Sequence, residues 1–347
     1  MSNILILGAG SMGTAFSFPC SENNNSVTIV GTYLENDFID VLNSKRMHPT
    51  LNLEVPKKVK FLKFNKLSDE LNKSVDLIVI AVISKGIEWV AEELSKVLKK
   101  EIPILVLTKG LAVHDNKYEV LAHKIERILR KNGIKQTNIS AAGGPCLASG
   151  LANKVHTSVI FANKDINTAN GIAKIASTAY YHISTTDDVV GVEICAAIKN
   201  IYSMAVGSSV GMCIANSSKE IEEKNYLNTA ASLMQQSIYE MITFTEKLKG
   251  KKETVIGLAG IGDLYVSADG GRNSKMGFYL GQGMTFVEAK KKMFNITVEG
   301  AELISEIGSK VKKDFDVKTL PLMICIINTI NENKPLLIEW DKFKQEN

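Results

Sequence analysis

Cysteine and proline are scarce in this chain, which otherwise has the composition of an ordinary globular protein. Its 347 residues include five cysteines and seven prolines, and 45% are hydrophobic against 22% charged. The cysteines, at positions 20, 146, 195, 213 and 325, are odd in number, widely spaced and form no CxxC pair. This pattern argues against a disulfide framework or a zinc site. We therefore expect no metal and a reducing, cytoplasmic location.

Strong charge of one sign and long hydrophobic runs are also missing. The formal net charge is only +4, and the basic residues are scattered, so no nucleic-acid partner is expected. The apolar run at 320–330 is shorter than the ~20 residues needed to cross a bilayer. The run at 4–7 is too short for a signal peptide and lacks a basic flank. We expect neither a membrane span nor a secretion signal.

The first part of the chain alternates short strand-like runs with amphipathic helical patterns. Runs rich in Ile, Val and Leu predict strands at 3–7, 27–30, 76–82, 104–107 and 138–142, and two further strands at the far edge of the sheet, 157–162 and 181–184. Helical patterns such as 89–99 and 118–131 lie between them. This alternation predicts an α/β fold, with a Rossmann-type doubly wound parallel sheet over residues 1–188.

After residue 188 the pattern becomes helical. Helices are expected at 189–216, 227–248, 285–292, 300–311 and 321–331, and no strand is expected. The sequence therefore predicts a second, all-helical domain over residues 189–347.

A glycine-rich turn joins the first expected strand to a helix. It reads GAGSMG at residues 8–13. Gly8 permits the turn, Gly10 lets the backbone approach a pyrophosphate, and Gly13 lets the helix pack close to the strand. The N–H groups at the helix start, around Ser11 and Met12, would face the phosphates. A tight turn without a ligand is the alternative, but the place directly after the first strand favours a dinucleotide.

The end of the second strand bears on the choice between NADH and NADPH. An acidic residue there would bind the ribose 2′-hydroxyl, whereas an arginine would favour the 2′-phosphate. The chain has Gly-Thr-Tyr at 31–33, so neither rule applies, and the Thr32 hydroxyl suits either cofactor. Arg46 is a candidate for the 2′-phosphate, or merely a solvated side chain. The absence of a carboxylate favours NADP, although Glu35 is near enough to keep NAD open.

One lysine stands out in the first helix of the second domain. Between Gly191 and Asn216 the only charged residues are Glu193 and Lys199. A helix of that composition is buried nearly all round, so Lys199 is expected in a place of low dielectric, where a lysine suits acid–base work. Burial alone favours a lysine that reaches the surface from a buried helix. The segments that follow favour the catalytic interpretation.

A glycine-rich segment at 258–277 is expected to be an anion-binding loop. Arg272 offers a planar set of donors suited to a phosphate monoester, and Asn273 adds an amide donor. Asp263 follows a Gly-Ile-Gly turn, where its carboxylate can pair with a lysine. The alternative is a surface loop with an ordinary arginine.

Two loops follow parallel strands of the first domain. Lys109 comes after the run at 104–107, and GGPC at 143–146 comes after the next expected strand. Both loops should lie at the carboxyl ends of the strands, where open α/β sheets bind ligands. A lysine at the end of a strand is often only a solvated terminus, so Lys109 alone decides nothing.

Taken in order, these segments resemble the NAD(P)-dependent glycerol-3-phosphate dehydrogenases. The resemblance spans most of the chain and rests on GAGSMGTA at 8–15, KGL at 109–111, GGPCLA at 143–148, EICAAIKNIYSMAVG at 193–207, GIGDL at 260–264, GGRN at 270–273 and VEG at 298–300. It implies hydride transfer between NADH or NADPH and a three-carbon phosphate, interconverting dihydroxyacetone phosphate and sn-glycerol 3-phosphate for glycerophospholipid synthesis. It also implies a homodimer.

The resemblance also assigns roles to individual residues. It implies that Lys199 is the catalytic acid and base, that Asp263 is its carboxylate partner, and that Lys109 orients the reaction. The implied substrate-binding residues are Lys109, Gly144, Cys146, Asn200, Ser267, Arg272 and Asn273. The implied cofactor-binding residues are Gly8, Gly10, Ser11, Met12, Gly13, Thr32, Lys109, Ala148, Arg272 and Glu299.

Some positions depart from the family, and two other functions stay open. Cys146 stands where many bacterial members have a serine, and a thiol is a weaker hydrogen-bond donor. The arginine that bacterial members carry at the second strand is absent. A two-domain dehydrogenase acting on another hydroxy acid would not need the Arg272 anchor. A non-catalytic dinucleotide sensor would not need a buried lysine beside Asp263.

Overall fold

The computed structural model describes residues 1–216 and 225–343, which form two compact units. The first unit comprises residues 1–109 and 120–193, and the second comprises residues 110–119 and 194–347. Residues 110–119 therefore belong to the second unit, and the chain then returns to the first. It enters the second unit again at Ile194, which lies inside a long helix.

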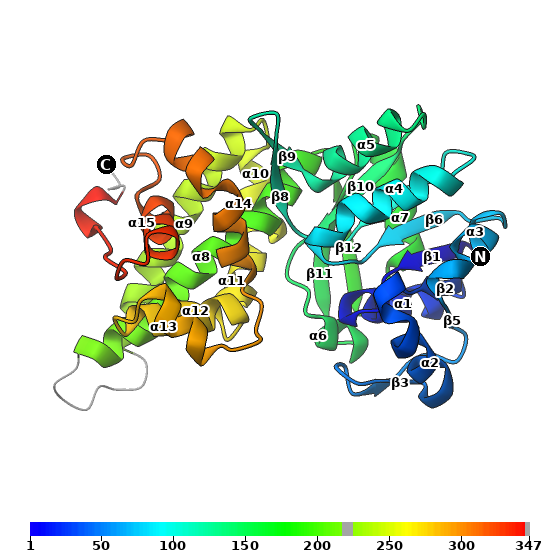
Figure 1. Cartoon of the computed structure of the whole chain (residues 1–347), viewed down its shortest axis with the longest axis horizontal. Helices are drawn as coiled ribbons and strands as arrows, with labels where there is room; N and C mark the ends of the chain where they lie inside the picture. The colour runs from blue at the N-terminus through cyan, green and yellow to red at the C-terminus, as the bar shows by residue number, and fades with distance from the viewer. Residues whose placement is uncertain (217–224, 344–347) are drawn as a thin grey trace. The chain divides into compact units, whose positions relative to one another are not determined.

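The first unit is built on one eight-stranded sheet (Figure 1). Every neighbouring pair of strands is parallel except β10 and β11, so the predicted doubly wound sheet is confirmed with one antiparallel pairing near its edge. The strands lie in the order β12 (Tyr181–Thr186), β11 (Thr157–Ala162), β10 (Ile139–Gly143), β7 (Ile104–Val106), β6 (Leu77–Ile80), β1 (Asn3–Leu7), β2 (Ser26–Val30) and β5 (Lys60–Leu62).

Alternating side chains of the central strands supply two separate cores. On β1, Ile4 and Ile6 belong to one buried cluster, whereas Leu5 and Leu7 belong to the other. The first cluster includes residues of α1 (Ser11–Glu22), α2 (Asn36–Lys45), α6 (Ala148–Ala152) and α7 (Ile166–Ala176). The second includes residues of α3 (Leu67–Leu71), α4 (Ile87–Val97) and α5 (Leu121–Lys131). Burial on both faces explains why these strands are apolar throughout.

Several short elements were not expected from the sequence. The edge strand β5 pairs with β2, and β3 (Met47–His48) pairs with β4 (Leu53–Glu54). Short 3₁₀ turns occupy η1 (Tyr33–Glu35), η2 (Phe64–Lys66) and η3 (Ser84–Gly86). The helix predicted at 118–131 begins only at Leu121, because β9 (Lys117–Val120) pairs with β8 (Leu111–His114).

Helices make up the rest of the second unit. They are α8 (Val189–Asn216), α9 (Tyr226–Lys247), α10 (Lys252–Ile256), α11 (Asp263–Ala268), α12 (Arg272–Gly281), α13 (Phe286–Lys292), α14 (Glu299–Asp314) and α15 (Pro321–Asn331), with a π-helical turn, η4 (Leu258–Gly262), and a 3₁₀ turn, η5 (Trp340–Lys342). The described residues after 189 contain no strand, as predicted. The hairpin β8–β9 adds Tyr118, whose ring lies 5.4 Å from that of Phe244.

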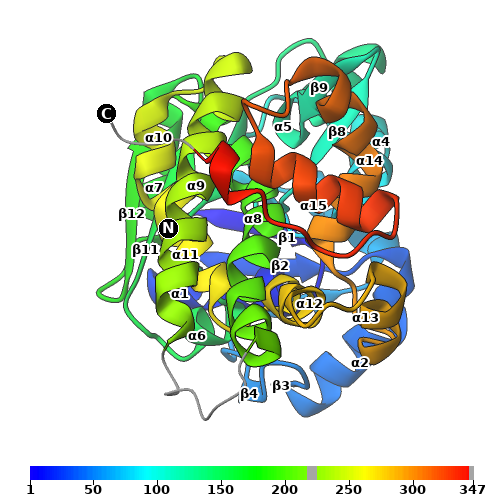
Figure 2. The same ribbon diagram turned by 90° about the vertical axis from the view of Figure 1, so that its left-hand side faces the viewer.

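The long helix α8 runs through the core of this unit, beside α9 in both views (Figures 1 and 2). The hydroxyl of Tyr202 on α8 donates to Glu240 on α9 at 3.1 Å, and both side chains are buried. By length and composition α8 could cross a membrane, but 89% of its most apolar window is buried within the structure. The core helix of a globular protein can have the same length and composition, so these features of α8 are not evidence that it spans a membrane.

Candidate functional site

The turn between β1 and α1 has the backbone geometry that the sequence predicted for it. Gly8 has φ = +107°, and a Cβ at this position would lie 2.7 Å from the carbonyl oxygen of Ala81. A Cβ on Gly13 would lie 2.3 Å from the carbonyl oxygen of Gly8, so α1 packs directly against the turn. Nothing lies within 4 Å of a Cβ on Gly10, the residue before α1, and no side chain caps that helix.

This turn fits the pyrophosphate of a dinucleotide. The open space beside Gly10 lets a ligand reach the backbone, and the first amide groups of α1, including those of Ser11 and Met12, carry the partial positive charge of a helix start. The first turn of α1 has no acidic residue to compete with an anion. The residues present therefore suit a bound NADH or NADPH.

A carboxylate lies at the end of β2 after all. The Oε2 atom of Glu35 accepts a hydrogen bond from the backbone N–H of Thr32 at 2.7 Å and from that of Ala9 at 3.3 Å. The sequence favoured NADP because β2 is not followed directly by a carboxylate, and it kept NAD open because of Glu35, which the structure places at this point. The guanidinium of Arg46 donates to the carbonyl oxygen of Pro56 at 2.6 Å. The side chains at this end of the sheet thus leave the choice of cofactor open.

The loops after β7 and β10 share one cavity with the start of α1. Met12, Lys109, Gly144 and Cys146 line it, together with apolar residues of the sheet. Gly144 has φ = +109°, and a Cβ there would lie 3.1 Å from the Cα of Val159, which explains a glycine at this position. The structure therefore brings together two loops that the sequence placed at the carboxyl ends of neighbouring strands. Ala148, another predicted residue, begins α6 just beyond.

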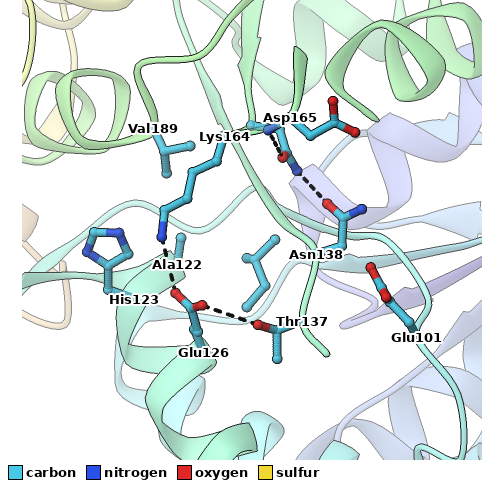
Figure 3. A pocket seen from close by; sticks show the side chains of 11 residues that line it. Glu101, Ala122, His123, Glu126, Thr137, Asn138, Lys164, Asp165 and Val189 are labelled. Carbon is cyan, nitrogen blue, oxygen red and sulfur yellow. Dashed lines mark hydrogen bonds and ion pairs between the residues drawn. The ribbon is translucent and has the colours of Figure 1, made fainter. Parts of the chain in front are cut away.

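A larger cavity of about 320 Å³ in the first unit is lined by none of the predicted site residues (Figure 3). Its polar side chains bind one another: Lys164 lies 3.4 Å from Glu126, Thr137 donates to Glu126 at 3.3 Å, and Asn163 donates to Asn138 at 2.8 Å. These contacts satisfy groups within the fold, so we do not place the candidate site here.

In the second unit, Lys199 is buried, as its helix composition predicted. Its side chain is 8% exposed, and its Nζ atom lies 2.5 Å from Oδ1 of Asp263, which is 2% exposed. Nζ also donates to the hydroxyl of Ser267. Because a buried ammonium is costly unless it is paired, these two partners hold the amine in place. The alternative of a lysine reaching the surface does not describe this residue.

The segment expected to be a loop at 258–277 is mostly helical. Asp263 and Ser267 are one turn apart on α11, which places both side chains on the face toward Lys199. The π-helical turn η4 precedes them, and a Cβ on Gly260 would lie 2.0 Å from the carbonyl oxygen of Val255. Glycine therefore serves close packing here rather than a flexible loop.

Arg272 and Asn273 begin α12, and both bind residues at the start of α14. The guanidinium of Arg272 donates to Glu299, with the two side chains 58% and 38% exposed. The Oδ1 atom of Asn273 accepts from the backbone N–H of Gly300 at 2.9 Å, and its Nδ2 donates to Oδ1 of Asn200 at 3.1 Å. Asn200 follows Lys199, so one connected set of residues joins the predicted anion anchor to the buried amine.

Close contact between α8 and α12 fixes this arrangement. A Cβ on Gly277 would lie 1.9 Å from the carbonyl oxygen of Met204, and one on Gly281 would lie 2.1 Å from that of Ser208. The two helices therefore meet backbone to backbone. The sequence analysis did not foresee this role, although the four-residue spacing of glycine on α12 was the available signal.

Two family models together match most of the chain. The model described as "NAD-dependent glycerol-3-phosphate dehydrogenase N-terminus" matches residues 3–169, and the corresponding C-terminus model matches residues 188–338. The NADP(+)-dependent glycerol-3-phosphate dehydrogenase of Archaeoglobus fulgidus is 30% identical over 317 residues, covering 90% of this chain and 91% of that protein. A glycerol-3-phosphate dehydrogenase [NAD(P)+] of Francisella tularensis is 31% identical over 316 residues, covering 90% and 88%.

Solved structures agree with this assignment. The glycerol-3-phosphate dehydrogenase of Coxiella burnetii matches with a TM-score of 0.80 at 25% identity, covering 96% of each chain. The enzyme of the same name from Saccharomyces cerevisiae matches with a TM-score of 0.82 at 19% identity and shares the fold. With both parts of the chain matched, and relatives at 30% identity over nearly their whole length, the chain belongs to the NAD-dependent glycerol-3-phosphate dehydrogenase family.

Proposed function

We propose that this chain is an oxidoreductase that interconverts dihydroxyacetone phosphate and sn-glycerol 3-phosphate with NADH or NADPH. The observation that carries the proposal is the buried ion pair of Lys199 and Asp263, 2.5 Å apart, in the same unit as Arg272. A ketone phosphate needs both a proton donor and an anion anchor, and these residues offer both.

Most of the residues that we assign to the cofactor lie in the first unit. The glycine turn at Gly8, Gly10 and Gly13 and the amides of Ser11 and Met12 bind the pyrophosphate. Thr32, Lys109, Ala148, Arg272 and Glu299 are the other residues that we assign to the cofactor. When bound, the nicotinamide supplies or accepts the hydride.

Lys199 moves the proton. Its ammonium gives a proton to the carbonyl oxygen when the ketone is reduced, and the neutral amine takes one from the hydroxyl when the alcohol is oxidised. Asp263 and Ser267 hold Nζ in position in both directions of the reaction. For Lys109, in the first unit, the family resemblance implies the role of a second cation that orients the reaction.

The remaining residues bind the substrate. Arg272 anchors the phosphate, since a guanidinium binds its oxygens in pairs. Asn200, Asn273 and Ser267 add polar contacts from the second unit. Gly144 and Cys146 contribute from the loop after β10, where the backbone N–H groups offset the weak donor strength of a thiol.

We also propose a cellular setting. All five cysteines lie in the described residues and none of them forms a disulfide, which suits a reducing, cytoplasmic compartment. In that compartment sn-glycerol 3-phosphate is a precursor of glycerophospholipids. We expect a homodimer, which a molar mass measured in solution by light scattering would test.

One spectrophotometric assay tests the function. The purified chain is given dihydroxyacetone phosphate with NADH and, in parallel, with NADPH, and the loss of the reduced nicotinamide is followed. Unphosphorylated dihydroxyacetone serves as the matched substrate. Consumption of the reduced nicotinamide only with unphosphorylated keto acids would indicate a different dehydrogenase. Cofactor binding without turnover of any three-carbon phosphate would indicate a dinucleotide sensor.

A further inference from the structure

The second unit contains a cavity of about 500 Å³ that none of the residues assigned to substrate or cofactor lines. One wall is a face of α9, and the others come from the start of α10, the segment before α15 and the turn η5. Both α10 and α15 pack against α9. The cavity is therefore a feature of one unit and separate from the site around Lys199.

Polar side chains make up most of the lining of this cavity. Tyr239, Thr243 and Thr319 bring hydroxyl groups, Gln236 brings an amide, and Ile242 adds an apolar side chain. The hydroxyl of Thr243 donates to the carbonyl oxygen of Tyr239 at 3.0 Å, which leaves its oxygen able to accept a further bond. Ligand sites for apolar molecules are lined mainly by hydrophobic residues, so this lining suits a ligand that carries hydroxyl groups.

The charged residues of the lining are three lysines and one carboxylate. Lys342 is bound to Glu339. Within the described residues neither Lys252 nor Lys318 forms an ion pair, so their ammonium groups can receive an anion. Glu246 has the opposite charge, so it disfavours a second anionic group on the ligand and accepts hydrogen bonds from hydroxyls. The charges thus suit one phosphate on a ligand that is otherwise neutral.

A buried carboxylate ties two walls of the cavity together. The amide of Gln236, which is 4% exposed, donates to Glu240 at 2.8 Å. Glu240, 1% exposed, also accepts from the backbone N–H groups of Leu322 and Met323 at 2.7 and 2.8 Å. The start of α15 and the segment before it are thereby held against α9. Walls that are fixed before a ligand binds lower the cost of ordering the site.

We infer that this cavity binds a small phosphorylated sugar or polyol. Lys252 and Lys318 hold its phosphate, and the side chains of Gln236, Thr243 and Glu246 bind its hydroxyl groups. The site is a second one, because it shares no residue with the proposed catalytic machinery.

Isothermal titration calorimetry tests the class of ligand. The purified chain is titrated with glucose 6-phosphate and, in parallel, with glucose and with inorganic phosphate, which are the two parts of that probe. We expect glucose 6-phosphate to bind more tightly than either part. Inorganic phosphate that binds equally well would overturn the assignment to a sugar or polyol. Absence of binding by glucose 6-phosphate at millimolar concentration would overturn the inference as a whole.

Variants of the two exposed lysines locate the phosphate. Lys252→Gln combined with Lys318→Gln should raise the Kd of glucose 6-phosphate about tenfold or more, as expected for lost contacts to a charged group. Both residues are exposed, so the fold should be kept. Lys292→Gln, exposed on α13, is the matched control and should bind like the wild type. An unchanged Kd in the double variant would overturn the inference.

One further titration separates this cavity from the proposed substrate site, which also takes a phosphate. Arg272→Ala should bind glucose 6-phosphate with the Kd of the wild type, because Arg272 does not line the cavity. Binding that is lost in Arg272→Ala and kept in the lysine double variant would place the probe at the substrate site and overturn the inference. A chain that does not turn over dihydroxyacetone phosphate would refute the proposed function alone, since the titrations require no activity.

Discussion

Lys199 Nζ lies 2.5 Å from Asp263 Oδ1, in a place where both side chains are almost completely removed from water. Taking either charge out of water alone costs several kcal/mol, and the partner offsets much of that cost. A chain selected only for stability would gain by placing apolar residues here. The pair therefore points to chemistry rather than to folding, and it leads to two separate predictions.

Replacing the amine should stop the reaction without releasing the cofactor. Lys199→Ala removes the proposed proton donor, so we expect kcat to fall by about 10²- to 10⁴-fold. The glycine turn that we propose for the pyrophosphate belongs to the other unit, so the dissociation constant of NADH should stay within a few-fold. Lys313→Ala, at an exposed position on α14, is the control. Substantial turnover by Lys199→Ala would exclude it as the acid.

The stability of the pair should be strongly non-additive. Lys199→Met leaves Asp263 buried without its cation, and Asp263→Leu leaves the ammonium without its anion. Each should lower the free energy of unfolding by about 3–5 kcal/mol. The double variant buries no charge at this place and should recover most of that loss. Denaturation by urea, followed by circular dichroism, measures all four proteins, and equal losses that simply add would contradict the expectation.

Replacing Arg272, the proposed phosphate anchor, should change the KM for dihydroxyacetone phosphate. Arg272→Ala removes the bidentate donor, so the KM for dihydroxyacetone phosphate should rise about 10- to 100-fold. Arg272→Lys keeps the charge but not the planar set of donors. Its KM for dihydroxyacetone phosphate should lie between those of the wild type and Arg272→Ala. Lys275→Ala, exposed on the same helix, is the control. A KM that does not change in Arg272→Ala would remove this residue as the anchor.

The sequence predicted the elements whose pattern is set by burial. The run at 3–7 was predicted with the bounds of β1, and α8 and α15 were predicted with the observed bounds, because each is apolar along its whole length. The hairpin β8–β9 was missed, although its turn residues Asp115 and Asn116, with φ of +47° and +57°, are typical of tight hairpins. The residues of this turn indicated a hairpin, but the helical pattern at 118–131 led to the prediction of a helix that includes β9.

For the candidate site, the sequence predicted which residues take part but not the local structure that holds them. The residue types were predictable, since a lone lysine in an apolar helix and a Gly-Gly-Arg-Asn segment are unusual. Their local structure was not predictable, because Gly260 serves packing against Val255 and the segment is helical instead of a loop. The bond from Gly300 to Asn273 joins residues 27 positions apart and has no periodic pattern. Such contacts depend on how helices cross, which the sequence does not state locally.

Glu35 should weaken the use of NADPH relative to NADH. Its carboxylate lies at the end of β2, and a negative charge there repels a 2′-phosphate. Glu35→Gln keeps an oxygen to accept from Thr32 but removes the charge. For a half-buried group we expect an effect of about 1 kcal/mol, roughly a fivefold rise in the ratio of kcat/KM for NADPH to that for NADH. Glu54→Gln, exposed in the same unit, is the control, and an unchanged ratio would exclude the effect.

Stability should depend on pH through Glu193. This carboxyl on α8 accepts from the backbone N–H of Ala122 at 3.0 Å. Burial raises its pKa from an ordinary 4.5 to about 8 and outweighs the N–H groups of Ala122 and Leu121, which lower it. Between these two values the folded chain keeps a proton that the unfolded chain releases. The stability gained from the neutral carboxyl is therefore complete below pH 4.5 and is lost as the pH rises toward 8.

The variant Glu193→Gln isolates this contribution, because it carries no titratable group at the position. The difference in free energy of unfolding between wild type and Glu193→Gln should shift against the wild type as the pH rises from 5 to 8, by at most about 1.4 kcal/mol per pH unit. Urea denaturation of both proteins across this range measures it. Parallel curves would mean that Glu193 has the same pKa in the folded and unfolded chains, and that its contacts with the start of α5 offset its burial.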